Sequence, residues 1–524
     1  MATQPGTRPG DEPATEPVTE PVTHVDVLIV GAGISGIGMA CHLTRELPER
    51  TYAVIERRDA IGGTWDLFRY PGIRSDSDMM TFAYGFRPWT SPRILADGDS
   101  IRTYLADTAA EYGVTEHIRF GRRVVSASWS SREGRWTVDI VDGRGVPERM
   151  TASFLVAGTG YYDYDQGFRP DFAGEQDFDG TIVHPQHWPA DLDYAGKKVV
   201  VIGSGATAVT LVPAMAETAG HVTMLQRSPT YVLSLPVTDK ITAALQRVLP
   251  TSFVYKTTRA RNIAVQRGIY ALAKARPGLV KALVRRGVQR QLAGASDIAH
   301  FTPRYDPWDQ RLCFVPDGDL FASIQSGRAD VVTGTIDTIT PTGIRLDSGE
   351  EIEADVIVTA TGLQVQMLGG ATLRVDGEPV SVSDSVFYKG VLLEGIPNAA
   401  LIFGYINASW TLKADIAATY VVRLLKHMAA RGADQVVVRA QDADRDSSSI
   451  LGALQAGYVR RGEAVLPRQG THGVWKVRND YFRDAPLLRH GAIDDGLLQF
   501  STTPARTATD TAADTDTAAT AATG

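Results

Sequence analysis

The stretch VDVLIVGAGISG, residues 25–36, decides the fold. Its apolar half predicts a buried strand, and the glycine-rich half predicts a tight turn that leads into a helix ending near Leu47. Residues 52–56 form a second apolar run. Together these segments predict a unit of strand, glycine turn, helix and strand.

The same order occurs a second time, in VVVIGSGATA, residues 199–208. A helical pattern follows to about Ala219, and residues 222–226 predict another strand. A glycine motif of this kind is informative only between a strand and a helix, and both copies have that context. The sequence therefore predicts an α/β fold with two Rossmann-like dinucleotide-binding domains.

Each turn has the residues that a pyrophosphate requires. The first glycine allows the turn, the second lets the backbone approach the phosphates, and the third position allows close packing of the helix, whose N-terminus favours an anion. The candidate phosphate-site residues are Gly31, Gly33, Ser35 and Gly36 in the first turn, and Gly203, Ser204, Gly205 and Thr207 in the second.

The end of the second strand in each unit distinguishes the two cofactors. Glu56, 25 positions after Gly31, is placed to accept hydrogen bonds from an adenosine ribose, which predicts FAD or NAD. The matching place in the second unit has Arg227 and Ser228, whose cation and hydroxyl suit the 2′-phosphate of NADPH. Two such sites in one chain predict a flavoenzyme that a nicotinamide cofactor reduces.

Several alternatives can be weighed against this prediction. A disulfide reductase needs a close cysteine pair, and Cys41 and Cys313, the 2 cysteines of the chain, lie far apart in sequence. The same scarcity argues against a thiolate metal site, and we expect no metal. A protein that binds both nucleotides without turnover would lack a cation beside the flavin.

The chain also divides by composition. Between Lys240 and Arg290 there are twelve Lys or Arg and no Asp or Glu, in a helical pattern. Small residues after the strands at 154–157 and 355–358 predict points where the chain passes between the two domains. The predicted organisation is disordered tails at 1–23 and 501–524, an FAD-binding domain at 24–165 and 355–500, an NADPH-binding domain at 166–230 and 300–354, and a basic helical insertion at 231–299.

Charge and hydropathy limit the partners. A net charge of -7 argues against binding to nucleic acid. No apolar run has the length of a membrane span, and we expect a cytoplasmic enzyme. The basic insertion fits either a solvated helical cap or weak peripheral contact of residues 240–290 with the inner face of an anionic membrane.

Between the two units stands FDGTIVHPQHWP, residues 178–189, which fits the pattern FxGxxxHxxxWP. This is the fingerprint of type I Baeyer-Villiger monooxygenases, and all its fixed positions are present: Phe178, Gly180, His184, Trp188 and Pro189. Residues 301–311 and 407–415 resemble the actinobacterial ethionamide-activating subgroup of that family. The resemblance covers about residues 24–495.

The resemblance also implies site residues. The stretch from Gly62 to Asp76 is similar to the family's active-site segment, GGxWxxxxYPGxxxD, which places Gly63, Thr64, Trp65 and Asp76 at the flavin. In the family a C4a-peroxyflavin, formed from FAD, NADPH and O2, attacks a ketone and gives an ester or lactone. By the resemblance Arg311 is the cation that stabilises the anionic species, and Asp76 pairs with it.

Two points stay open in the sequence. Many relatives have Lys before the catalytic Arg, whereas this chain has Gln310, so preference for NADPH rests on Arg227 and Ser228. His184 has two interpretations, as a substrate-side residue or as a hinge residue between the domains. The alternative activity is oxygenation of sulfides, thioamides or amines by the same flavin, and Trp188-Pro189 favours the ketone reaction.

Overall fold

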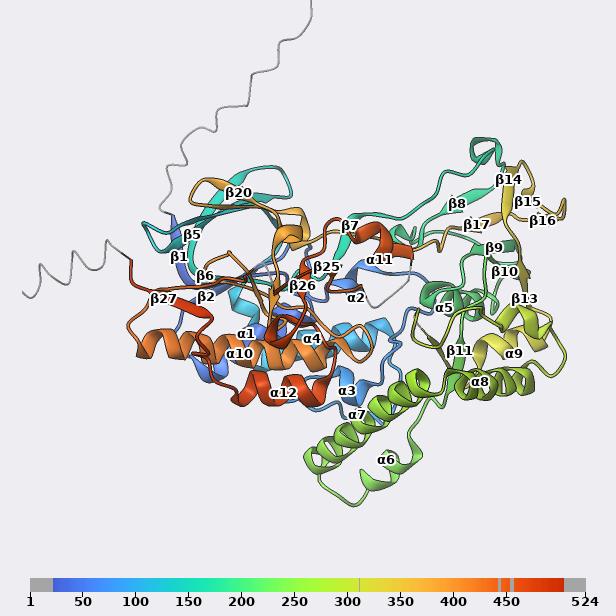
Figure 1. Cartoon of the computed structure of the whole chain (residues 1–524). Helices are drawn as coiled ribbons and strands as arrows, with labels where there is room; N and C mark the ends of the chain where they lie inside the picture. Colours follow the sequence, from blue (N-terminus) through green and yellow to red (C-terminus); the bar gives the residue numbers. More distant parts are fainter. Residues whose placement is uncertain (1–21, 311, 442–443, 453–456, 504–524) are drawn as a thin grey trace, which may run out of the picture.

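Two sheet units stand side by side in the computed structural model, which describes residues 22–310, 312–441, 444–452 and 457–503 (Figure 1). A glycine turn follows the central strand of each unit, so the predicted α/β fold with two Rossmann-like units and a helical insertion is confirmed. The predicted tails lie outside the described residues, apart from 22–23 and 501–503. Thr23 begins the first strand and Ser501 ends the last one.

The first sheet has 11 strands and is built around β1 (Thr23–Val30). β1 lies between β2 and β6 and is parallel to both, and β4 and β5 extend the sheet beyond β6 in antiparallel fashion. Val27, Leu28 and Ile29 are fully buried because helices or strands cover both faces of β1. The other strands are β2 (Tyr52–Ile55), β3 (Ile118–Arg119), β4 (Arg122–Ser130), β5 (Arg135–Asp142), β6 (Pro147–Ala157), β19 (Thr372–Val375), β20 (Glu378–Val380), β21 (Phe387–Tyr388), β22 (Leu392–Leu393) and β23 (Ala399–Leu401).

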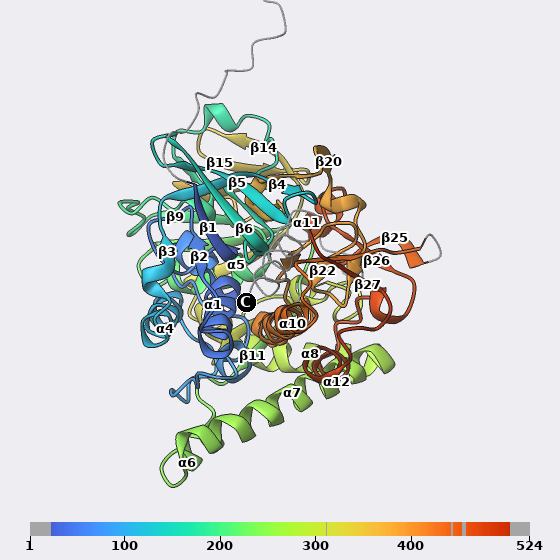
Figure 2. The same cartoon turned by 90° about the vertical axis from the view of Figure 1, so that its left-hand side faces the viewer.

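Helices distant in sequence cover one face of this sheet. α1 (Ile34–Glu46) packs beside α10 (Trp410–Ala430), as Figure 2 shows, and α12 (Tyr481–His490) packs on α10. A buried ion pair joins the first two helices, with His42 Nε2 2.9 Å from Asp415 Oδ1. The remaining elements of this unit are α2 (Thr64–Leu67), α3 (Met79–Phe82), α4 (Gly98–Glu111), β24 (Gln435–Val438), β25 (Arg445–Ser449), α11 (Gly457–Gly462), β26 (Arg468–Gly470) and β27 (Leu498–Ser501).

The second sheet is parallel throughout, with the order β13-β10-β9-β17-β8. α5 (Ala206–Met215) ends four residues before the predicted Ala219, because the chain turns back there and Gly220 N–H donates to the Lys197 carbonyl. The elements of this unit are β8 (Thr181–Val183), β9 (Lys198–Ile202), β10 (His221–Gln226), α9 (Asp319–Gln325), β13 (Ala329–Thr333), β14 (Ile336–Thr340), β15 (Gly343–Leu346), β16 (Glu351–Glu353) and β17 (Val356–Val358).

The chain crosses between the sheets twice, and the two crossings pair with each other. β7 (Tyr162–Gly167) and β18 (Leu363–Val365) form an antiparallel ribbon. The second crossing begins after Val358, because β17 is hydrogen-bonded into the second sheet beside β9. Residues 356–358 therefore pair with the second sheet, and the crossing follows them.

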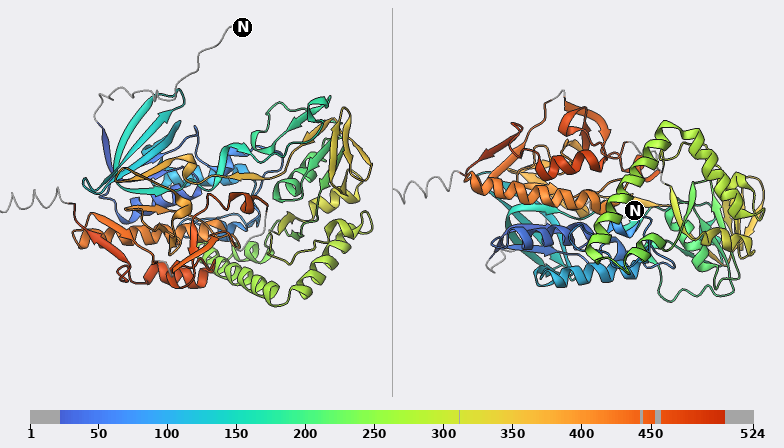
Figure 3. Two further views of the ribbon diagram at one scale, coloured as in Figure 1. Left: turned by 45° about the horizontal axis from the view of Figure 1, so that its top comes forward. Right: turned by 90° about the horizontal axis from the view of Figure 1, so that it is seen from below.

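The insertion is helical and touches both units. β11 (Val232–Leu235) pairs with β12 (Cys313–Pro316), and between them lie α6 (Lys240–Leu245), α7 (Thr251–Ala275) and α8 (Pro277–Leu292). α7 packs against α3 of the first unit, and α8 packs against α9 of the second. Seen from below in Figure 3, the green helices lie across the junction of the two units.

Residues 67–73, which begin at the last residue of the first unit's α2, enter the hydrophobic core of the second unit. Leu67, Phe68 and Tyr70 are buried in the cluster that surrounds α5. Gly72 has a φ of +76°, and a Cβ there would lie 2.7 Å from Ala214 Cβ and 2.9 Å from the Thr210 carbonyl oxygen. Only glycine lets this loop approach α5 so closely.

We expect Gly72→Ala to lower the Tm by about 3–8 °C more than Gly145→Ala, because the added methyl group must displace α5. Gly145 has a similar φ of +82°, and no atom lies within 4 Å of a Cβ added there. The pair separates the contact with α5 from backbone strain, which both variants carry. Equal Tm losses in a thermal unfolding experiment would contradict the role of this contact.

Candidate functional site

The first glycine turn is tightly packed by backbone. Gly31 has a φ of +101°, and a Cβ on Gly36 would lie 1.8 Å from the Gly31 carbonyl oxygen. Gly33 caps α1 without a side-chain hydrogen bond, and the first turn of the helix contains no acidic residue. The free N–H groups at this helix start can therefore meet an anion.

Glu56 lies just after β2 and is 3% exposed. Burial raises the pKa of its carboxyl group, while hydrogen bonds from the backbone N–H groups of Ala32 and Arg58, at 2.6 and 2.8 Å, act in the opposite direction. The carboxylate is thereby fixed beside the turn, in the position that the sequence assigns to a ribose partner.

A second glycine segment closes over the first turn. Gly63 has a φ of +57°, and a Cβ there would lie 2.9 Å from Gly33 Cα. α2 begins directly afterwards with Thr64 and Trp65, and the Trp65 ring meets Phe82 edge-on at 5.7 Å between centroids. The segment thus brings its side chains to the turn because two glycine backbones touch.

The second glycine turn is open on its outer side. Gly203 has a φ of +139°, Gly205 caps α5, and no atom lies within 4 Å of a Cβ added to Gly205. Ser204 Oγ donates to the Ser228 carbonyl at 3.1 Å and so holds the end of β10 beside the turn. Arg227 and Ser228 are both exposed.

Thr207 of the second turn lies against the first unit. The Tyr70 hydroxyl is beside the Thr207 side chain, and burial raises the pKa of Tyr70 while that hydrogen bond lowers it. The 67–73 loop therefore reaches the helix start at which the second nucleotide is predicted.

A cavity of about 680 Å³ lies at the first turn and extends to the insertion. Of the predicted flavin-site residues, Gly31, Gly33, Ser35, Glu56, Gly63, Thr64, Trp65 and Asp76 line it. The residues predicted for the second turn do not line it, and neither do the five fingerprint residues. The structure thus brings the predicted flavin-site residues together around the cavity. It places the second-turn residues and the fingerprint residues outside the cavity lining.

Arg311, the predicted catalytic cation, lies outside the described residues. Its neighbours Gln310 and Leu312 line the cavity, as does Trp308, whose φ is +68°. Asp76 lines the same cavity. Among the described residues, no group of three His, Cys, Asp or Glu side chains could hold a metal ion.

The fingerprint residues lie where the chain enters the second sheet. A Cβ on Gly180 would lie 2.3 Å from the Asp355 carbonyl oxygen and 2.6 Å from the Phe178 ring. Trp188 is half-buried against Tyr194, and Pro189 follows it. These contacts favour a structural role for the motif at the junction.

His184 packs on the crossing ribbon. A Cβ on Gly167, the last residue of β7, would lie 1.9 Å from its Cε1, and its Nδ1 accepts the Gln186 N–H at 3.2 Å. Burial lowers the pKa of His184. Of the two interpretations left open by the sequence, this geometry favours the hinge.

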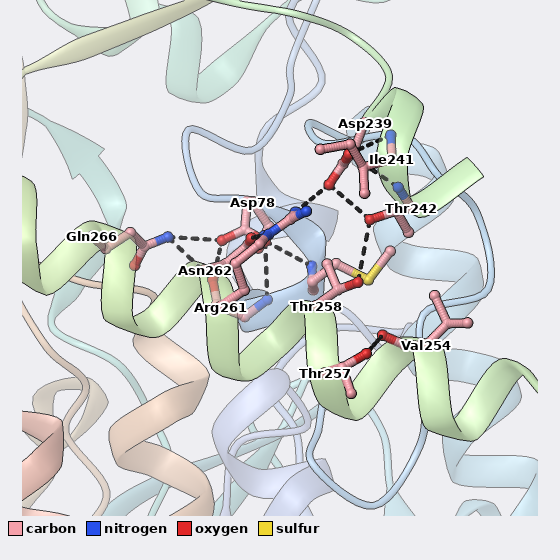
Figure 4. A network of polar contacts seen from close by, with 12 residues as sticks. Asp78, Asp239, Ile241, Thr242, Val254, Thr257, Thr258, Arg261, Asn262 and Gln266 are labelled. Carbon is pink, nitrogen blue, oxygen red and sulfur yellow. Dashed lines mark hydrogen bonds and ion pairs between the residues drawn. The ribbon is translucent and has the colours of Figure 1, made fainter. Parts of the chain in front are cut away.

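The sequence did not indicate how α7 is attached over the cavity. Asp78, which caps α3, accepts hydrogen bonds from Asn262 Nδ2 at 2.8 Å and Gln266 Nε2 at 2.7 Å (Figure 4). All three residues line the cavity. The amide pair at positions i and i+4 of α7 was the signal available in the sequence.

Arg259 makes a second attachment of the same helix. The residue is 8% exposed, and its Nη1 donates to the carbonyl oxygens of Met80, Thr81 and Ala83 at 2.8, 3.1 and 2.7 Å. These carbonyls end the short helix α3, so the guanidinium group satisfies acceptors that would otherwise be buried without a donor.

Trp410, which begins α10, joins the cavity wall to the first turn. Its Nε1 donates to Ser35 Oγ at 2.8 Å, and its ring stacks on Tyr161 with centroids 5.6 Å apart. Both aromatic residues line the cavity. The start of α10 and the insertion, through Val265 and Ile269, thus both contribute to the cavity wall.

Two glycine turns of the dinucleotide-binding type, with a cavity at the first of them, indicate the class of protein. Residues 24–460 match the flavin-binding monooxygenase-like family, and the chain belongs to that family. The sequence-based prediction of a flavin monooxygenase is thereby confirmed.

Three named relatives are similar in sequence to this chain over almost its whole length. MymA of Mycobacterium tuberculosis, a putative FAD-containing monooxygenase, is 56% identical over 91% of this chain and 98% of the relative. The FAD-containing monooxygenase EthA of the same organism is 51% identical over 92% and 99%. AlmA of Acinetobacter baylyi, a probable FAD-binding monooxygenase, is 52% identical over 91% and 96%.

Solved structures share the fold at lower identity. A steroid monooxygenase bound to NADP has a TM-score of 0.72 at 24% identity, covering 92% of this chain and 100% of its own. The cyclohexanone monooxygenase of Rhodococcus sp. Phi1, bound to NADP+, has a TM-score of 0.71 at 20% identity with the same coverage. At these identities the likeness supports the fold.

We expect Arg259→Met to lower the free energy of unfolding by about 3 kcal/mol, because it leaves three buried carbonyls without a donor. Arg267→Met, on the same helix, removes an exposed ion pair with Asp480 and should change it by less than about 1 kcal/mol. Urea unfolding, with hydrogen exchange of residues 79–83 as a local readout, would measure both. Similar losses in the two variants would refute the anchoring role.

Proposed function

We propose that this protein is an FAD-dependent monooxygenase that uses NADPH and O2 to convert ketones to esters or lactones. The supporting observation is a single cavity that joins the first glycine turn, Trp65 and Asp76 to the segment around Gln310, in a chain that contains the complete FxGxxxHxxxWP pattern. The family membership supports the flavin monooxygenase part of the proposal.

The residues at the first turn fit FAD. Gly31 and Gly33 line the cavity at the start of α1, where a pyrophosphate would meet the helix N-terminus, and a side chain at Gly36 would collide with the turn. The fixed carboxylate of Glu56 suits a ribose and would repel a 2′-phosphate. The second turn, with exposed Arg227 and Ser228, suits NADPH.

When bound, FAD would accept a hydride from NADPH and activate O2. The chain's own contribution is electrostatic and steric. Arg311 would stabilise the negative charge that develops on the carbonyl oxygen, and Asp76 would orient that guanidinium group. Trp65, Tyr161 and Trp410 would exclude water from the cavity, which strengthens both interactions.

A second candidate is oxygenation of sulfides or thioamides. The 301–311 and 407–415 segments resemble the ethionamide-activating subgroup, and EthA is 51% identical to this chain. A sulfide develops no oxyanion on a carbonyl, so this reaction depends less on Arg311 than ester formation does. A product panel with ketones and one sulfide distinguishes the two.

We expect Arg311→Ala to lower ester formation by about a hundredfold or more while reduction of the flavin by NADPH continues, because only the later step needs the cation. Gas chromatography measures the ester, and bleaching of the flavin absorbance measures reduction. Arg304→Ala, an exposed position in the same segment, is the control. Ester formation that survives Arg311→Ala, or even Arg311→Lys, would refute the assignment.

The preference for NADPH over NADH tests the role proposed for Arg227 beside the second glycine turn. We expect Arg227→Gln to reduce kcat/KM for NADPH about tenfold and to leave the value for NADH nearly unchanged, because only NADPH carries the 2′-phosphate. Steady-state kinetics with both cofactors measures this. Equal kcat/KM for NADPH and NADH in the unmodified enzyme would reject Arg227 as the partner of the 2′-phosphate. Gln310 is uncharged and supplies no second cation there, so the preference depends on Arg227 and Ser228.

A further inference from the structure

Exposed apolar side chains concentrate on the insertion. Of the thirteen large apolar residues that are exposed in the described part of the chain, nine lie between Ile241 and Leu283. At the start of the insertion's helices, Ile241 is 64% exposed, Val248 77% and Phe253 53%. A monomeric surface seldom leaves such large side chains together in water without a partner.

Positive charge occupies the same helices. Twelve Lys and Arg lie between residues 240 and 290, and one of them, Arg259, is buried and donates hydrogen bonds to backbone carbonyls. Four others form ion pairs with carboxylates of the described residues: Arg261, Arg267, Lys274 and Lys281. The other seven form no ion pair within the described part of the chain: Lys240, Arg247, Lys256, Arg276, Arg285, Arg286 and Arg290.

The two properties coincide in one segment, residues 240–256, which we term the tip. It comprises α6, the connection to α7 and the first turns of α7, and it projects beyond both sheet units at the lower edge of Figures 1 and 2. Its cations are Lys240, Arg247 and Lys256, all exposed. The preceding carboxylate, Asp239, is paired with Arg261 and does not offset them.

We propose that the tip docks on an anionic lipid bilayer, with Ile241, Val248 and Phe253 inserted at the interface and the three cations at the lipid headgroups. Charge complementarity selects this partner, because anionic headgroups accept cations while the adjacent acyl region accepts apolar side chains. The attachment is peripheral, since no helix among the described residues is long and apolar enough to cross a bilayer.

One continuous helix links the tip to the cavity. α7 connects the tip to the cavity wall, where Val265 and Ile269 lie. Twelve residues separate Phe253 from Val265, about 18 Å along a helix. If the proposed function holds, docking places the wall of the substrate cavity near a reservoir of apolar molecules. Membrane binding itself requires no turnover, so it can be tested separately.

Co-sedimentation with phosphatidylcholine vesicles that contain about a third phosphatidylglycerol tests the proposal. We expect binding at low salt, weaker binding at high salt, and little binding to phosphatidylcholine alone. Phe253→Ser should weaken partitioning about tenfold, because an inserted aromatic side chain is lost. Phe482→Ser is the matched control, since Phe482 is also 53% exposed but lies on α12.

Three results would overturn the proposal. The first is failure to bind anionic vesicles at low salt. The second is equal weakening by Phe253→Ser and Phe482→Ser. The third is a concentration-dependent dimer in sedimentation velocity that Phe253→Ser abolishes, because the tip would then be covered by a second copy of the chain.

A depth measurement separates insertion from simple charge attraction. In Phe253→Trp, brominated lipid should quench more tryptophan fluorescence than in Phe482→Trp, because only the first side chain enters the interface. Equal quenching in the two variants would reject insertion of the tip. Arg247→Gln with Lys256→Gln should reduce binding to anionic vesicles and its dependence on salt.

Discussion

The packing of residues 67–73 into the core beneath α5 is the contact on which the rest of the structure depends. Leu67, Phe68 and Tyr70 belong by sequence to the segment that closes over the first glycine turn, yet they are buried with the residues of the second sheet. One continuous loop therefore touches both nucleotide-type turns. The β7–β18 ribbon alone would leave the two units joined by two strands, whereas this loop fixes one turn relative to the other.

Much of the fold could be predicted because its signals are local. The two glycine turns, the strands before them and the helices after them depend on backbone conformations that only a few residues permit, and Gly31 and Gly203 both have positive φ. The residues predicted at the flavin lie together for a related reason, since Gly63 approaches Gly33 by a backbone contact. Of the nine residues predicted at the flavin, all but Gly36 line the cavity.

The rest depends on contacts between distant segments. Asp78 and Gln266 are 188 positions apart, and neither has a pattern that reveals its partner. Strand β17 has the same composition whichever sheet it joins, and only its pairing with β9 assigns it to the second sheet. His184 was ambiguous because the sequence does not reveal that it packs against Gly167. Pairing across the fold, more than residue type, decides these positions.

The hydrogen bond from Trp410 to Ser35 makes the two ends of the cavity interdependent. The Trp410 indole forms part of the cavity wall and also donates a hydrogen bond to Ser35 of the glycine turn. An indole has one N–H donor, so this hydrogen bond fixes the orientation of the ring. A family that diversifies its wall by replacing position 410 must also find a new partner for the hydroxyl at position 35. The cavity wall is thus coupled to the first glycine turn through this hydrogen bond, so a substitution at either position is expected to affect both.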